Sequence, residues 1–297
     1  MRALQAAIPA RVGVFILIGV ASCFASNHLC ARIAFDHGAS VPAAVAVRAG
    51  VSSLVLLVML RLQKIPLAIP GPLRPAALFC GVLIAAQSYC LYSAVALIPP
   101  ALALLVFQTS PMLYVLLTWA LGKERPRWSA LLPMALALAG LALALNLAGG
   151  AIDAQWAQVR AGVAWAFASG VCMSIVYYVN ANALQRLDGR LRTFVMMAVT
   201  AALVIAGGAS AGAMAFPHGI GWLGLALLTL FYCVAMTSLF LVLPRLPPTV
   251  TAALNFEPIA LLFLGWVFLG FSVTPLQLLG AFMVVGAIAW LGMARRG

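Results

Sequence analysis

The chain consists of long apolar segments separated by short polar connections. A bilayer span needs about 20 mostly apolar residues, and ten segments of the 297-residue chain meet this requirement. Strands of a membrane β-barrel would alternate apolar and polar positions, which these segments do not do. We therefore predict an all-α membrane protein with ten transmembrane helices, at residues 12–35, 41–60, 75–98, 100–121, 128–148, 160–183, 192–213, 220–243, 248–270 and 275–294.

Composition supports this prediction and excludes several functional classes. Hydrophobic residues make up 65% of the chain and charged residues only 7%, whereas soluble domains are about a quarter charged. The net charge of +12 does not indicate a nucleic-acid partner, because the basic residues lie between the apolar segments. The six cysteines fall inside these segments, without disulfide or metal-ligand spacing. Since no phosphate loop or catalytic constellation is present, we predict a protein that is not an enzyme and needs no cofactor.

The loop charges predict the orientation of the helices. If the N-terminus is cytoplasmic, the basic residues of the connections and termini fall almost entirely on the cytoplasmic side, and Arg160 is the exception. Such a bias is the positive-inside pattern of membrane proteins. It predicts that both termini are cytoplasmic and that the protein is a multi-pass protein of a bacterial inner membrane.

The two halves of the chain repeat each other. The pair Pro99-Pro100 recurs 148 residues later as Pro247-Pro248, and Pro111 recurs 147 residues later as Pro258. Each half contains five predicted spans, and an odd number places the second half upside-down relative to the first. We therefore predict two inverted five-helix repeats, residues 12–148 and 160–294, an organisation found in many secondary transporters.

Several motifs resemble a known family. They are the Glu257-Pro258 step followed by an apolar run to Gly270, the segment 274–281 that enters the last span, Gly122 with Glu124, and Arg48 in the second span. Together they resemble the drug/metabolite transporter superfamily, and within it the EamA-like ten-helix group. The resemblance implies a transporter that exports small metabolites, such as amino acids or their analogues, by alternating access. The chain departs from the family pattern in lacking an acidic residue before Pro111 and after Gly270.

Glu257 is the strongest candidate for a functional residue. It lies nine residues beyond Pro248, roughly 13 Å deep in a hydrocarbon core of about 30 Å. An unpaired carboxylate there costs several kcal/mol, so it must pair, take up a proton or face water. It can serve as a site for a proton or a substrate amine, or it can be a structural carboxylate. Pro258 loosens the preceding turn, whose freed carbonyls would line a cavity beside Asn255.

Other polar residues inside the spans each have two interpretations. Arg48 can neutralise Glu257, bind a substrate carboxylate, or extend its charge outward to the membrane surface. His28, next to Asn27, can relay protons or simply pack and form hydrogen bonds. Arg32 shares a helix face with His28 and Asp36, which suits an interfacial cluster of charges. Polar residues in spans 3 and 6 either line a cavity or hold helices together, and they are Gln87, Tyr92, Tyr177 and Asn180.

These observations favour a secondary transporter whose partners are a small solute, protons and membrane lipids. The small residues at 207–212 would permit close helix contacts within one chain or in a homodimer. Two other classes remain open, an uncoupled facilitator or channel and a non-transporting scaffold or lipid-handling protein. The predicted site comprises the binding residues and the prolines that break helices, namely Glu257, Asn255, Arg48, Gln108, His28, Asn27, Gln87 and Tyr177, with Pro258 and Pro111.

Overall fold

The computed structural model describes residues 8–122, 128–144, 155–242, 245–246, 253–254, 256–270 and 274–294, and its regular elements in these ranges are helices. Apart from short 3₁₀ turns, among them η1 (Gly71–Leu73), these elements are α-helices. In chain order these are α1 (Ala10–Asp36), α2 (Val41–Leu62), α3 (Arg74–Leu97), α4 (Pro100–Phe107), α5 (Ser110–Ala120), α6 (Trp128–Ala144), α7 (Gln155–Asn182), α8 (Gly189–Ser210), α9 (Gly221–Val242), α10 (Glu257–Leu269) and α11 (Pro275–Ala294).

Length and composition make seven stretches of the described residues capable of crossing a membrane. They correspond to α1, α2, η1 with α3, α4 with α5, α7, α8 and α9, and α10 and α11 contribute shorter apolar helices. The all-helical membrane class predicted from the sequence is therefore confirmed. The count of ten spans and the sides of the termini stay predictions.

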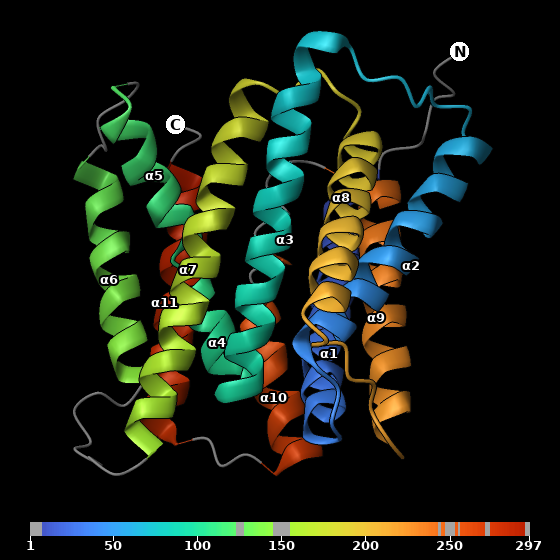
Figure 1. Cartoon of the computed structure of the whole chain (residues 1–297). Helices are drawn as coiled ribbons and strands as arrows, with labels where there is room; N and C mark the ends of the chain where they lie inside the picture. Colours follow the sequence, from blue (N-terminus) through green and yellow to red (C-terminus); the bar gives the residue numbers. More distant parts are fainter. Residues whose placement is uncertain are drawn as a thin grey trace.

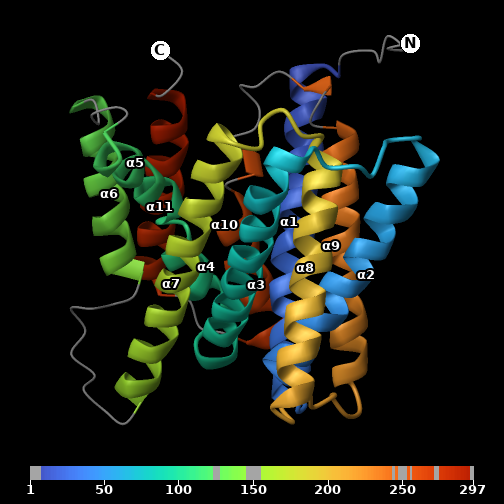
Figure 2. The same cartoon turned by 45° about the horizontal axis from the view of Figure 1, so that its top comes forward.

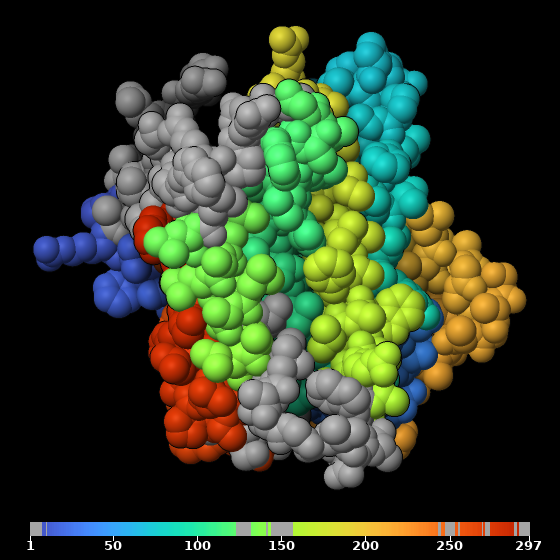
Figure 3. Space-filling model, turned by 90° about the vertical axis from the view of Figure 1, so that its left-hand side faces the viewer, coloured from blue at the N-terminus to red at the C-terminus, as the bar shows by residue number. Residues whose placement is uncertain are grey.

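The helices form one bundle whose contacts follow the internal repeat (Figures 1 and 2). The most extensive pairs are α6 with α11, α1 with α9, α3 with α7 and α2 with α8. Exchanging the halves, so that α1 corresponds to α7, α2 to α8 and α3 to α9, maps this set of pairs onto itself. Figure 3 faces the side of the bundle that is on the left in Figure 1, where α6 in green lies against α11 in red. The pairing thus gives the two-repeat architecture a pseudo-two-fold arrangement.

Both spans that contain the repeated prolines have a helix that begins inside the span. Residues 100–121 were predicted as a single span, but the helix stops at Phe107 and starts again at Ser110. In the second half α10 starts only at Glu257, so the predicted helix over 248–270 is shorter among the described residues. Proline has no N–H and a fixed φ, which suits the first turn of a helix and not its interior. Pro111 and Pro258 accordingly both occupy first turns.

Turns hold the bundle together at both of its ends. At the lower end in Figure 1, the α1–α2 turn meets the α8–α9 turn, where the His218 N–H donates to the His37 carbonyl (3.0 Å) and the Ser40 N–H to the Ala215 carbonyl (2.9 Å). At the upper end, the α2–α3 connection meets the α7–α8 turn through a hydrogen bond from Arg190 to Gln63. Leu60, Leu187 and Leu191 form a small apolar cluster there. These two contacts correspond to each other under the repeat, and we call them the lower and upper clasps.

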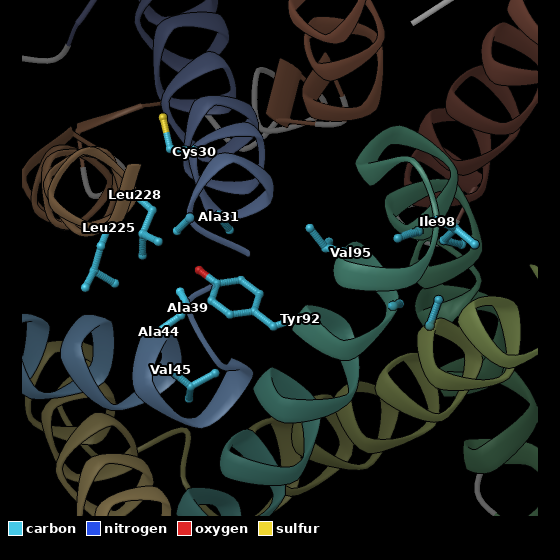
Figure 4. Packing of buried hydrophobic residues seen from close by; sticks show 14 of the residues in the cluster. Cys30, Ala31, Ala39, Ala44, Val45, Tyr92, Val95, Ile98, Leu225 and Leu228 are labelled. Atoms are coloured by element: carbon cyan, nitrogen blue, oxygen red, sulfur yellow. The ribbon is translucent and has the colours of Figure 1, made fainter. Parts of the chain in front are cut away.

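Small residues dominate the central core between α1, α2, α3 and α9. Figure 4 shows the ring of Tyr92 reaching from α3 toward Ala31 of α1, Ala44 of α2 and Leu228 of α9. Lipid tails are as apolar as leucine, so helices in a membrane associate mainly through close packing and polar contacts. A Cβ on Gly224 of α9 would lie 2.9 Å from backbone atoms of α1, which shows how closely these two helices approach.

Candidate functional site

Glu257 occupies the first position of α10, where the chain enters a helix in the interior of the apolar span. The negative charge lies at the positive end of the helix dipole, and Pro258 supplies the fixed φ of the first turn. The carboxylate lies beside His28 of α1, with 3.5 Å between His28 Nε2 and Glu257 Oε1. This distance is longer than a well-formed hydrogen bond, and a single proton on the pair would convert the contact into a charge-assisted one.

The exposure of these two side chains differs. The His28 side chain is 8% exposed, whereas 24% of the Glu257 side-chain surface is open. Part of the Glu257 side chain is therefore open, whereas the His28 side chain is enclosed. His28 Nδ1 is fully buried and has no hydrogen-bond partner among the described residues. The pair is thus positioned to exchange a proton on the Glu257 side while the other imidazole nitrogen stays shielded.

Asn27 and Tyr92 fix the position of α1 beside its neighbours. The Asn27 Nδ2 group donates to the Leu228 carbonyl of α9 (2.7 Å) and to the Tyr92 hydroxyl of α3 (3.1 Å). The Tyr92 ring also packs edge-on against the His28 ring, with 5.9 Å between centroids. Asn27 is only 1% exposed, so its observed contacts are those of a residue that joins helices. Through Tyr92 it also helps to orient His28.

Arg48 is buried against two tyrosines instead of a carboxylate. Its guanidinium carbon lies 4.9 Å from the centre of the Tyr92 ring and 4.4 Å from that of Tyr232 in α9. Its Nη2 donates to Ser88 Oγ (2.7 Å), but Nε is buried without a partner. Taking a guanidinium out of water costs several kcal/mol. Two cation–π contacts return about 0.5–2 kcal/mol each and a hydrogen bond to a charged group about 1.5–3 kcal/mol, so little net stabilisation remains.

The prediction that Arg48 could neutralise Glu257 is not what the structure shows. The ion pairs among the described residues are Glu257 with His28, Asp36 with Arg32 and Asp188 with Arg190. Arg32 also donates to the Val95 and Ala96 carbonyls at the end of α3 (both 3.2 Å). Arg32 and Asp36 therefore form the interfacial cluster considered from the sequence. His28, which shares their helix face in sequence, turns instead toward α10.

Gln87 extends the polar contacts from Arg48 to the second half of the chain. Ser88 Oγ donates to Gln87 Oε1 (3.3 Å), and Gln87 Nε2 donates to Ser169 Oγ of α7 (3.1 Å). Ser169 Oγ donates in turn to the Gln87 carbonyl (3.1 Å). These side chains are 9% exposed or less. Gln87 is therefore part of a polar line from α2 through α3 to α7, which holds these helices in register.

Two predicted residues lie at the break between α4 and α5, where Gln108 is part of the span and Tyr177 packs against it from α7. Tyr177 of α7 packs edge-on against Tyr114 of α5, with 6.2 Å between ring centroids. Its hydroxyl approaches Ser110, although Ser110 Oγ has no partner of hydrogen-bond geometry among the described residues. Gln108 is half-buried in the break between α4 and α5. Asn255 lies outside the described residues.

Sequence reasoning missed Tyr232, Ser88 and Ser169. Tyr232 carries one of the two rings against Arg48, and the serines carry the hydrogen bonds. A tyrosine in the middle of the otherwise apolar span 220–243 was the one available signal. Serines are common in membrane helices, and their hydroxyls often bond their own backbone, so the two serines gave no distinctive signal.

Apolar helices in a two-fold bundle, with a partly open carboxylate inside it, define a multi-pass membrane protein of a transporter type. The model of the EamA-like transporter family matches residues 11–146 and again residues 160–293. The chain therefore belongs to the EamA-like transporter family, within the drug/metabolite transporter superfamily, as its motifs predicted.

Comparison with solved structures agrees with this fold. One, described only as "Crystal structure of protein", superposes with a TM-score of 0.67 at 20% sequence identity, covering 96% of this chain and 99% of that chain. At this identity the likeness concerns the fold alone. No curated protein matches the chain.

Proposed function

We propose that this membrane protein is a secondary transporter that exports small metabolites, such as amino acids or their analogues, across a bacterial inner membrane. Family membership supports the transport of small solutes. The observation that carries the proposal further is the contact between His28 and Glu257 at the start of α10 (3.5 Å). Ionisable residues inside a membrane are expensive to keep there, and they commonly mark substrate and proton pathways.

In the proposed mechanism, the Glu257–His28 pair holds a proton or the amine of the solute. Glu257 has the open side-chain surface and is the group that the solute or water reaches. The interruptions before Pro111 and Pro258 supply points at which α5 and α10 can tilt relative to the rest of the bundle. The two clasps are equivalent under the repeat, so opening one while keeping the other closed exposes the site to one side at a time.

Purified protein in liposomes tests this proposal. Pooled amino acids and other metabolites are offered with and without an imposed pH gradient, and uptake is identified by mass spectrometry. The wild-type protein is expected to move a subset of solutes faster with the gradient. Flux that follows only the solute gradient would indicate a facilitator, and absence of any solute flux would indicate a non-transporting protein.

A pair of carboxylate variants assigns the coupling. Glu257→Gln keeps the size of the side chain and is expected to remove the response to the pH gradient. Asp36→Asn is the matched control, because Asp36 is 47% exposed and pairs with Arg32 at the end of α1. Gradient-driven flux that persists unchanged in Glu257→Gln would refute the proton-binding role.

A further inference from the structure

Arg48 is the buried charge that the proposed function leaves unexplained. The chain has five acidic residues. The three that the structure describes pair with His28, Arg32 and Arg190, so none of them neutralises Arg48. Arg48 is nevertheless only 5% exposed, and its Nε has no hydrogen-bond partner among the described residues. A charge in this position calls for an anion that the protein itself does not provide there.

The surroundings hold the guanidinium in place without satisfying it. Tyr92 and Tyr232 press against it with ring faces, which attract a cation but accept no strong hydrogen bonds. Ser88 Oγ accepts one hydrogen bond from Arg48 Nη2 and donates its own proton to Gln87 Oε1. The planar guanidinium offers five N–H donors in a fork that matches a carboxylate. Several donors are therefore held in a fixed orientation with no protein acceptor bonded to them.

The position of Arg48 places this fork beside the proposed proton site. Tyr92 contacts both Arg48 and His28, and His28 contacts Glu257. The α2 helix begins seven residues before Arg48, which puts it roughly 10 Å from that end of the helix. A small solute bound between Arg48 and Glu257 would thus have a cationic neighbour on one side and the Glu257–His28 pair on the other.

We propose that Arg48, held between Tyr92 and Tyr232, binds the carboxylate of the transported solute. This assignment rests on the proposed transport function and narrows its substrates to small molecules that carry a carboxylate, with or without an amine. Arg48 is then the residue that recognises the solute's anion, and the Glu257–His28 pair interacts with its proton or amine.

Equilibrium binding to the purified protein in detergent tests the assignment with three matched probes. L-leucine carries both charges, isocaproate keeps only the carboxylate, and L-leucinamide keeps only the amine. We expect both carboxylates to bind the wild-type protein with saturation. Arg48→Gln should weaken the binding of both carboxylates by roughly tenfold or more, as expected for the loss of one charge-assisted pair. The affinity for leucinamide should stay within about twofold of the wild-type value. Arg48→Lys keeps the charge but not the forked donors, so its affinity for the carboxylates should lie between those of the wild-type protein and Arg48→Gln.

Arg32→Gln is the matched control, because Arg32 is also an arginine inside an apolar helix but already has Asp36 as its partner. It should leave the affinity for the carboxylates within about twofold. Folding of each variant is checked by gel filtration, and Arg48→Lys keeps the test valid if Arg48→Gln does not fold. Wild-type affinity for isocaproate in a folded Arg48 variant, equal weakening of all three probes, or absence of carboxylate binding by the wild-type protein would overturn the assignment.

Transport measurements separate this assignment from the proposed coupling. If L-leucine binds through Arg48 but its transport into liposomes shows no response to a pH gradient, the anion site stands and proton coupling fails. If Glu257→Gln abolishes gradient-driven flux while Arg48→Gln binds carboxylates normally, the coupling stands and the anion site fails.

Discussion

The two spans that contain the repeated prolines each have a helix that begins inside the span, and the two helix starts differ in chemistry. The α5 helix begins at Ser110 and α10 at Glu257, exactly one repeat apart, and a proline follows each. In the second half the residue at the break is a carboxylate facing a histidine of α1 (3.5 Å). In the first half it is a buried hydroxyl beside Tyr177 of α7. The repeat has therefore kept the break in both halves and the charge in only one.

This difference separates what the fold needs from what the proposed chemistry needs. A break in each half gives both repeats an interior helix end, which movement of the two halves about a common site would use. A carboxylate in each half would place two negative charges inside one bundle, where each raises the energy of the other's ionised form. One carboxylate is sufficient for one proton, so the halves can be equivalent in movement without being equivalent in charge.

The largest expected effect comes from removing this asymmetry at the break. Glu257→Ser gives the second half the side chain of the first, and we expect gradient-driven flux to fall to the level of protein-free liposomes. Ser110→Ala removes the equivalent group of the first half and should change flux by no more than about twofold. Flux of an identified solute in liposomes measures both. A similar loss in the two variants would show that the halves share the chemistry.

Substitutions of the two prolines should have similar effects, unlike those of Glu257 and Ser110, because a helix begins at a proline step in both halves. Alanine at position 111 or 258 restores an N–H, which can bond to a carbonyl one turn earlier and extend the helix across the break. We expect each substitution to slow transport by roughly threefold to tenfold, corresponding to about 1 kcal/mol. The melting temperature should stay equal or rise. If only one of the two substitutions slows transport, the breaks are not equivalent in function.

The sequence predicts the class of fold well because bilayer length and loop charge are local properties. Each predicted apolar segment contains a helix among the described residues, and the repeated prolines mark the places where two of the spans are interrupted. Glu257 and His28 could each be singled out, because a polar residue in an apolar span is conspicuous. Their contact could not be predicted, since they are 229 positions apart and belong to opposite halves.

Helix rotation explains the rest of what the sequence left undetermined. A span that is apolar on all sides carries no stripe to indicate which face points inward, and one residue along a helix turns the side chain by about 100°. The sequence could therefore not decide whether Arg48 points toward Glu257 or elsewhere. Only the packed structure shows that it faces Tyr92 and Tyr232. His28 shares a helix face with Arg32 and Asp36 as expected, but its partner is Glu257 of α10, whereas Arg32 and Asp36 pair with each other.

Two glycines should reveal a smaller difference between equivalent helix pairs. A Cβ on Gly224 would lie 2.9 Å from the backbone of α1, whereas a Cβ on Gly162 of α7 would meet the side chain of Ile98. Backbone cannot move aside as a side chain can, so Gly224→Ala should destabilise the protein by about 1–3 kcal/mol. Gly162→Ala should cost less, because the atoms that its Cβ meets belong to the Ile98 side chain, which can shift. Thermal unfolding in detergent compares them, and equal losses would mean that the α1–α9 and α3–α7 contacts are equally rigid.

The smallest expected effect concerns the two equivalent helix caps of the clasps. Ser40 caps α2 and accepts from the Ala43 and Ala215 N–H groups (3.3 and 3.0 Å), and Asp188 caps α8 and accepts from the Arg190 N–H (2.8 Å). The hydrogen bond and charge of Arg190 hold the pKa of Asp188 below its ordinary value. That interaction therefore stabilises the fold above the ordinary aspartate pKa and is lost as the pH falls through the lowered one.

Asp188→Asn keeps a capping oxygen and removes only the charge. Because Asp188 is 34% exposed, its ion pair is screened, and we expect a loss below about 1 kcal/mol at neutral pH. This loss should begin to shrink as the pH falls through the ordinary aspartate pKa of about 3.9, and it should vanish only below the lowered pKa of the folded protein, where the wild-type carboxylate is protonated as well. Ser40→Ala should instead lower stability by about 1 kcal/mol equally at every pH, since no charge is involved. Thermal unfolding of both variants between pH 3 and 8 tests this, and a pH-independent loss in Asp188→Asn would show that the upper clasp depends on geometry alone, as the lower one does.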